Sequence, residues 1–282
     1  MLRSMYSGIS GMKNFQTKLD VIGNNIANVN TFGYKKGRVT FQDMVSQSIS
    51  GASAPTTVAP LKGGVNPKQV GLGSQLSTID TIHTQGSLQT TGRSLDLAIS
   101  GDGFFEVANG SGGLIVGSTY TRSGNFYLDS GGDIVNAEGK YLVGVKTIVN
   151  GVVTETEAPI NIPTDSKSFS IGSDGTISYV DKDGELQTAG QIAITKFSNT
   201  GGLEKVGSNN YQETTNSGEP LKGIAEGDTG AGSIVAGALE MSNVDLSEEF
   251  TEMITAQRGF QANTRIITTS DEILQELVNL KR

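Results

Sequence analysis

The sequence predicts an α+β protein, in which N- and C-terminal α-helices form a coiled-coil core and a mainly antiparallel β domain lies between them. Apolar residues recur at alternating spacings of three and four near both ends of the chain. The middle contains short apolar runs separated by glycine-containing turns, which is typical of antiparallel strands. We divide the chain into an N-terminal core helix (1–35), an extended connector or long hairpin (36–75), a β-rich domain (76–236) and a C-terminal core helix (237–282).

The first 30 residues carry one apolar stripe at helical spacing. Gln16 and Gly23 occupy two positions of the same stripe, so the predicted helix has only a modest apolar face. The apolar members, which we assign to core packing, are Leu2, Met5, Ile9, Met12, Leu19 and Ile26.

The last 40 residues give the strongest helix prediction, over about 246–280. Asp245 followed by Glu248 has the spacing of a capping box, and Lys281 and Arg282 lie where the helix dipole favours cations. Polar Gln257 and Thr264 interrupt the stripe. Its apolar members, also assigned to core packing, are Phe250, Met253, Phe260, Ile267, Leu274 and Val278.

Between the helices, the sequence first predicts a connector and then strands. Residues 46–75 are rich in Ser, Gly, Ala and Pro and poor in bulky apolar residues. Further on, Asn150-Gly151 stands between two apolar pairs and predicts a type I′ hairpin turn. Gly101–Gly103, Asp174-Gly175 and Asp183-Gly184 predict further turns.

The two predicted helices have opposite charge tendencies. Basic residues outnumber acidic ones over 1–30, and the reverse holds over 240–282, which favours pairing of unlike helices. Each apolar stripe is buried only against the other helix or against copies of the chain. Because both stripes contain polar residues, two alternatives stay open: a hairpin of helices within one chain, or ordering when many copies pack together.

Composition excludes several classes of function. The chain has no cysteine and one histidine, so disulfides, thiol nucleophiles and multi-histidine metal centres lack their residues. A net charge of −8 argues against nucleic-acid binding. We find neither a run of about 18 apolar residues that would span a membrane nor a secretory signal peptide.

Weak motifs do not support an enzyme. Gly101-Asp102-Gly103 does not continue into a dinucleotide-binding fingerprint, and Asp181–Gly184 lacks most ligands of a calcium loop. His83 has no nucleophile elbow as its partner, and we expect it on the surface of a strand. We therefore expect no catalytic residue, cofactor, metal site or small-molecule substrate.

Four longer segments, in the same order along the chain, resemble the bacterial flagellar rod and hook family. They are NNIANVNTFGYKK (24–36), LDLAISGDGFFEV (95–107), YTRSGNFYLDSGGDIVNAEGKYLVG (120–144) and the tail from Gly237 to Leu280. Within that family the stretch AQRGFQANTRIITTSDEIL (256–274) is similar to hook proteins. The length suits a compact hook form without an additional outer domain, common in Gram-positive bacteria, and also suits the alternative, a distal rod subunit.

The resemblance implies a structural subunit rather than an enzyme. Terminal helices would form an inner tube and the β domain would lie outside it, in a bendable joint that carries torque from rod to filament. Implied partners are copies of the chain, rod and hook–filament junction proteins, a hook cap and the export apparatus. Export by the flagellar type III system without a cleaved signal peptide would place it in the extracellular hook or basal body, and Phe41 to Val45 fits an export-gate element.

Overall fold

The computed structural model describes residues 2–55, 63–111, 114–146, 156–225 and 230–280. It confirms the predicted fold class: one α-helix near each end of the chain, with antiparallel strands between them. The chain divides into two compact units. We call Met1–Ala27, Gly37–Thr81 and Asp245–Arg282 the helical unit, and Asn28–Lys36 with Ile82–Val244 the β unit.

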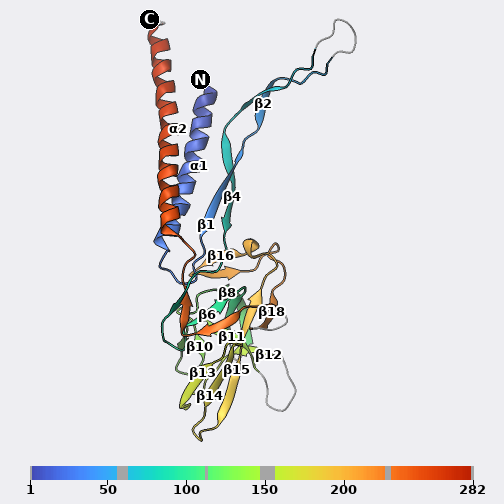
Figure 1. The fold of residues 1–282 in the computed structure, drawn as a ribbon, viewed down its shortest axis with the longest axis vertical. Helices are drawn as coiled ribbons and strands as arrows, with labels where there is room; N and C mark the ends of the chain where they lie inside the picture. Colours follow the sequence, from blue (N-terminus) through green and yellow to red (C-terminus); the bar gives the residue numbers. More distant parts are fainter. Residues whose placement is uncertain (1, 56–62, 112–113, 147–155, 226–229, 281–282) are drawn as a thin grey trace. The chain divides into compact units, whose positions relative to one another are not determined.

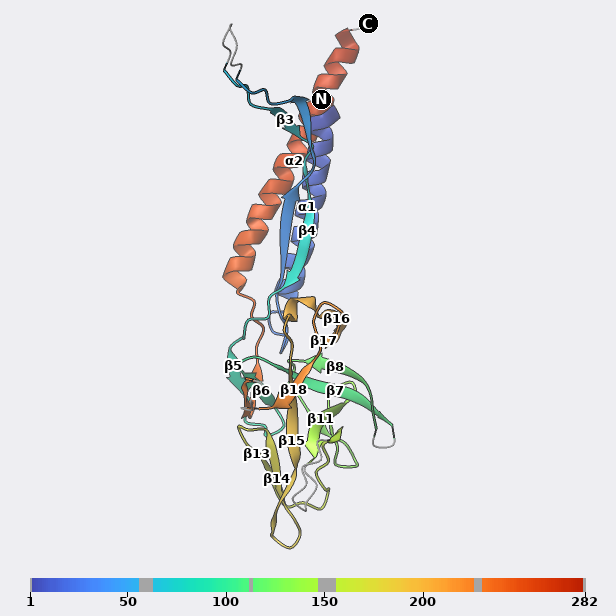
Figure 2. The same cartoon turned by 90° about the vertical axis from the view of Figure 1, so that its right-hand side faces the viewer.

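The helical unit contains α1 (Leu2–Ala27) and α2 (Leu246–Leu280). They lie side by side and antiparallel, and the last turns of α2 extend past the start of α1 (Figures 1 and 2). Neither helix contains any of the six prolines. Asp245 caps α2, because its Oδ1 accepts hydrogen bonds from the Ser247 N–H at 2.8 Å and the Glu248 N–H at 3.4 Å. The predicted basic residues Lys281 and Arg282 lie outside the described residues.

A long two-stranded ribbon completes the helical unit. Strand β1 (Gly37–Asp43) pairs with β4 (Ser74–Thr81), with a register shift between Thr40 and Phe41. Strand β2 (Ser46–Ser50) continues the ribbon by pairing with β3 (Lys68–Gly71). Phe41 contacts Phe15 of α1, with ring centroids 6.3 Å apart, so one part of the ribbon packs on that helix.

The β unit contains a 12-stranded sheet whose main path is β13-β14-β15-β11-β7-β8-β17-β16. Every strand pairing that the structure describes is antiparallel. The bounds along this path are β13 (Ser168–Ile171), β14 (Thr176–Val180), β15 (Leu186–Lys196), β11 (Tyr141–Lys146), β7 (Phe104–Ser111), β8 (Leu114–Thr121), β17 (Asn210–Gln212) and β16 (Glu204–Gly207).

Shorter strands flank this path. Strands β9 (Tyr127–Leu128), β10 (Ile134–Val135), β12 (Thr156–Pro159) and β18 (Leu221–Ile224) join the sheet off the main path. Two separate pairs are β5 (Leu88–Thr90) with β20 (Ala238–Glu240) and β6 (Leu97–Ser100) with β19 (Ser233–Ala236). A 3-10 helix, η1, spans Thr200–Gly202. Strand β20 lies in the segment for which we predicted the C-terminal core helix, and α2 begins six residues after it.

A continuous apolar core holds the β unit together. Leu97, Phe105, Phe126, Leu142 and Ile194 are among its fully buried side chains. The predicted turns at Asp174-Gly175 and Asp183-Gly184 connect β13 to β14 and β14 to β15, and both glycines have positive φ. The Asn150-Gly151 turn that we predicted lies outside the described residues.

Candidate functional site

The two helices of the helical unit approach each other through small residues. A Cβ atom added to Gly259 of α2 would come within 2.6 Å of the Phe15 ring, closer than real Cβ contacts allow. A Cβ at Gly11 of α1 would lie 3.0 Å from the Asn263 side chain, and Ala256 is buried in the same contact zone. Glycine at these positions therefore sets how closely the backbones pack.

Polar side chains close one end of this helix pair. Asn25 is 1% exposed, and its Nδ2 donates hydrogen bonds to Glu249 Oε2 at 3.1 Å and to the Gly37 carbonyl at 2.9 Å. The Gly37 N–H in turn donates to Asn25 Oδ1 at 3.0 Å. The side-chain amide of Asn25 thus joins α1, α2 and the start of β1. A buried polar contact of this kind fixes the register of the two helices more than it stabilises them.

Some of the predicted core residues take part in this contact, and others lie beside it. Ile267 Cγ1 lies 3.4 Å from a Cβ built at Gly8, and Thr264 Oγ1 lies 3.4 Å from Met12 Sδ. The buried positions Gly8, Gly11 and Asn25 each precede a predicted residue by one: Ile9, Met12 and Ile26. On α2, buried Glu249 precedes Phe250 in the same way. The helices thus meet through small residues together with some of the predicted apolar side chains, and Ile22, which we did not predict, is 3% exposed.

Many of the predicted core side chains consequently stay accessible in a single chain. Ile9 is 37% exposed, Phe250 50% and Val278 65%. The half-buried members are Met5, Met12, Leu19, Ile26, Met253, Phe260, Ile267 and Leu274. The side chain of Leu2 lies outside the described residues. Ile254, Ile266, Ile273 and Leu277 add further exposed apolar area to α2. Exposed apolar side chains that gather on one helix in this way are typical of an interaction surface.

The ribbon also exposes apolar side chains. Val45, at the end of the predicted export element, is 81% exposed, and Phe41 is 38% exposed. Ile49 and Val70, farther along the ribbon, are exposed as well. A two-stranded ribbon is marginally stable by itself in water, so covering this surface would stabilise it.

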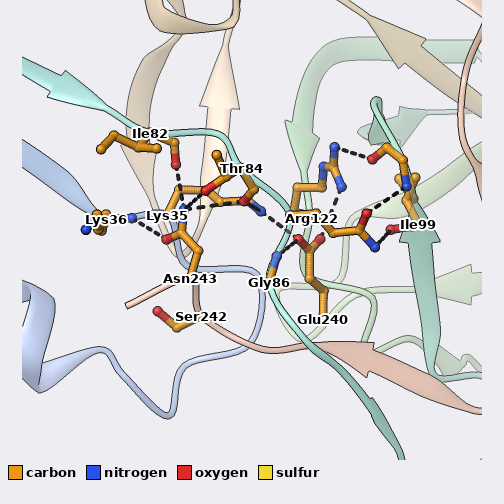
Figure 3. A network of polar contacts seen from close by, with 12 residues as sticks. Lys35, Lys36, Ile82, Thr84, Gly86, Ile99, Arg122, Glu240, Ser242 and Asn243 are labelled. Atoms are coloured by element: carbon orange, nitrogen blue, oxygen red, sulfur yellow. Dashed lines mark hydrogen bonds and ion pairs between the residues drawn. The ribbon is translucent and has the colours of Figure 1, made fainter. Parts of the chain in front are cut away.

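A buried charge network ties together distant segments of the β unit (Figure 3). Glu240 is fully buried, and its carboxylate accepts hydrogen bonds from Lys35 Nζ at 2.6 Å, Arg122 Nη1 at 3.2 Å and the Gly86 N–H at 2.9 Å. Burial lowers the pKa of Lys35, and the neighbouring Glu240 charge opposes that effect. A buried carboxylate with three donors is well satisfied, whereas loss of one partner would leave an expensive unpaired charge.

Asn243 extends this network. Its Oδ1 accepts a hydrogen bond from the Lys36 N–H at 2.8 Å, and its Nδ2 donates to the Ile82 carbonyl at 2.8 Å and to Thr84 Oγ1 at 3.0 Å (Figure 3). Hydrogen bonds therefore join the segment between α1 and β1 to the segment that precedes α2. Sequence reasoning missed this network, since a pairing of Lys35 with Glu240 has no local signal.

His83 does not lie on the surface of a strand, as we had predicted, but after the end of β4. Its ring packs edge-on against Phe104 and Tyr211, with centroids 5.6 and 5.3 Å away. Burial is the largest cause that lowers its pKa to about 4, and the positive charges of Lys35, Lys205 and Arg122 lower it further. A neutral imidazole in this position acts as an aromatic packing residue.

The described residues offer no grouping of three or more His, Cys, Asp or Glu side chains that would hold a metal ion. Asp181 and Gly184, which begin like a calcium loop, close a turn through the Gly184 N–H and the Asp181 carbonyl at 2.9 Å. Within the described part of the chain, neither helix is apolar enough over a sufficient length to cross a membrane.

Three family profiles match the chain. The profile described as "Flagella basal body rod protein" matches residues 5–35, "Flagellar hook protein FlgE/F/G D1 domain" matches 98–179, and "Flagellar basal body rod FlgEFG protein C-terminal" matches 235–280. These ranges include most of α1, strands β7 to β13 of the β unit, and α2.

Whole-chain relatives come from the same group of proteins. The chain is 60% identical to the flagellar basal-body rod protein FlgG of Bacillus subtilis (strain 168), with 100% of both chains covered. It is 37% identical to FlgG of Borreliella burgdorferi, again over 100% of both chains. The flagellar hook protein FlgE of Borreliella burgdorferi is 33% identical, with 100% of both chains covered in an alignment of 450 positions.

Proposed function

Because the chain belongs to the family of flagellar basal-body rod and hook proteins, we propose that it is a distal rod subunit, which assembles with copies of itself into the drive shaft of the flagellum. The observation that carries this proposal is the 60% identity to a rod protein over the full length of both chains. Hook relatives are 30 to 33% identical, in alignments of 450 and 473 positions for a chain of 282 residues. Those hook proteins thus contain long additional segments.

The comparisons support this alternative better than the hook protein that the tail sequence led us to prefer. The stretch 256–274 lies in a segment that one profile describes jointly for FlgE, FlgF and FlgG, so it does not separate hook from rod. Length and whole-chain identity separate them better. A rod subunit also differs in its mechanical role, because a drive shaft stays straight whereas a hook bends.

The accessible apolar surface of α1 and α2 supports assembly through the helices. We assign the predicted core residues, including Phe250, Phe260 and Val278, to contacts with neighbouring copies. Each square ångström of apolar surface that they bury contributes about 25 cal/mol, against a backbone ordering cost of about 1 to 2 kcal/mol per residue. Apolar surface buried against neighbouring copies would offset this ordering cost, so order in the helices would increase with assembly.

The remaining assignments follow from this role. Partners are further copies of the chain, adjoining rod and hook proteins, an assembly cap and the flagellar export apparatus, and the location is the basal body outside the cytoplasm. Phe41 and Val45 are exposed on the ribbon, where an export component can reach them. The role is structural, without catalysis, cofactor or small-molecule substrate.

Assembly of a Val278→Asp variant tests the helix contact. Val278 is 65% exposed in the single chain, so the charge should leave the monomer folded and block polymer formation. Asn279→Asp, an exposed neighbour on the same helix, is the matched control and should assemble. Sedimentation measures assembly, and electron microscopy measures polymer shape. Straight tubes from the unmodified chain support a rod, curved tubes support a hook, and normal assembly of Val278→Asp would refute the helix contact.

A further inference from the structure

The β unit contains an open pocket of about 350 Å³ that no step of rod assembly explains. Four loops converge on it: residues 30–32, residues 121–125 after β8, the turn 136–138 between β10 and β11, and the turn 208–210 between β16 and β17. Its volume lies within the usual range of about 300 to 1,000 Å³ for ligand pockets. The pocket is thus large enough for a small polar ligand.

Most residues that line this pocket carry an amide or a hydroxyl, and apolar atoms make up the larger part of the exposed wall between these polar groups. Five asparagines line it, together with two serines and two threonines. Phe32 supplies the one aromatic ring and Glu138 the one charged side chain of the described lining. An amide both donates and accepts hydrogen bonds, so this wall suits a ligand whose groups also do both.

Hydrogen bonds to the protein hold several of these amides in place. Asn209 Nδ2 donates to the Phe32 carbonyl at 3.0 Å, and Asn210 Nδ2 donates to Glu138 Oε2 at 2.9 Å. Asn136 Oδ1 accepts the N–H groups of Glu138 and Lys140, each at 2.9 Å. One half of each amide is therefore fixed, which orders the other half before any ligand arrives.

Ser208 and Asn209 form the two-residue hairpin turn between β16 and β17 at this pocket. Ser208 and Asn209 have φ values of 50° and 59°, and they are the non-glycine residues with positive φ in the described part of the chain. Glycine adopts this conformation more easily than serine. Positive φ at both central residues is typical of a type I′ hairpin turn, and this turn places two polar side chains on the pocket wall.

The charges at the pocket select the class of ligand. Lys140 Nζ lies 3.2 Å from Glu138 Oε2, so the one charged side chain of the described lining is already paired and the pocket offers no unpaired charge to an ionic ligand. A hydrogen bond from Ser208 is the largest cause that lowers the pKa of Glu138, which keeps it ionised. One carboxylate also falls short of the pair needed for glycoside hydrolysis. We propose that this amide-lined pocket binds a neutral saccharide without cleaving it.

Saturation-transfer NMR and calorimetry on the full-length chain test this proposal. The probes are maltotriose, cellotriose and triacetylchitotriose, with glucose 6-phosphate as the anionic comparison. We expect at least one neutral trisaccharide to bind, and glucose 6-phosphate to bind more weakly. Ser208→Gly and Asn209→Gly each remove a polar side chain from the wall at a position where glycine fits the backbone, so both variants should fold. Each should weaken binding by about tenfold.

Gln187→Ala, at an exposed position of β15 outside the pocket, is the control and should bind like the unmodified chain. The proposal is overturned when none of the three neutral probes binds at about 10 mM, a concentration that detects even weak binding. Equal affinity of the unmodified chain and both glycine variants would also overturn it. So would a loss of self-assembly in Asn209→Gly without any saccharide binding, because the pocket would then receive a neighbouring copy.

Discussion

The helical unit and the β unit use apolar side chains in opposite ways. In the β unit, large residues such as Phe105, Phe126 and Leu142 are fully buried in one core. In the helical unit, the tightest contacts come from Gly11, Gly259 and other small residues, and large apolar side chains remain accessible. The β unit can therefore fold within a single chain, whereas the helical unit has apolar surface left for other chains.

A pair of truncations should give the largest contrast between the units. Phe105→Ala removes a fully buried ring and should lower the free energy of unfolding by about 3 to 5 kcal/mol. Ile273→Ala removes a side chain that is half exposed and should change the unfolding of dilute monomer by less than about 0.5 kcal/mol. Denaturant unfolding followed by circular dichroism measures both. Similar losses for the two variants would show that the helical unit has a conventional core.

Lowering the pH should reduce the folding stability of the β unit through protonation of His83. Its pKa is about 4 in the folded chain and 6.5 as the ordinary value, so the unfolded chain binds the proton first as the pH falls. The contribution of the neutral ring is complete above pH 6.5 and is lost as the pH falls from 6.5 to about 4. The full loss is about 3 kcal/mol.

His83→Phe keeps an aromatic ring beside Phe104 and Tyr211 but cannot titrate. Unfolding midpoints between pH 7 and pH 4 should therefore fall less in this variant than in the unmodified chain. The carboxylates contribute equally to both proteins, so the difference isolates the imidazole. Parallel pH profiles would contradict the assignment.

A smaller effect is expected where the helices touch. Gly259→Ala adds a Cβ within 2.6 Å of the far end of the Phe15 ring, so the ring or the helices must shift, at a cost of about 1 to 3 kcal/mol. Gly23→Ala is the matched control, because nothing lies within 4 Å of a Cβ at Gly23 and alanine is the better helix former. Thermal unfolding of helical signal measures both. Equal or greater stability of Gly259→Ala would show that the close contact is not required.

The regular features of this fold were predictable from the sequence, because they depend on local patterns. The spacing of apolar residues and the capping pattern at Asp245 predicted the C-terminal helix, and Asp245 caps it. The exact contact between the helices was not predictable by the same reasoning, since Gly8 and Gly11 carry no apolar signal while Ile9 and Met12 do. The spacing of apolar residues therefore predicts the contacting face of a helix to within about one residue.

The polar features were beyond local reasoning for a different reason. Glu240 meets Lys35 across 205 residues of sequence, and only the folded sheet brings them together. The amide-lined pocket likewise forms where four loops that are far apart in the sequence come together. By contrast, Asn and Gly cluster in the segment that ends at Gly33, which is a local signal for a turn, and Gly33 has the positive φ that such a turn requires.

The buried network also determines when the β unit can be completed. Lys35 is made early and lacks its counter-charge until Glu240 emerges, 205 residues later. At the usual pace of synthesis, about 5 to 20 residues per second, that interval lasts about 10 to 40 seconds. An unpaired lysine resists burial throughout this time. Lys35 can therefore be buried with its counter-charge only after nearly the whole β unit has been synthesised.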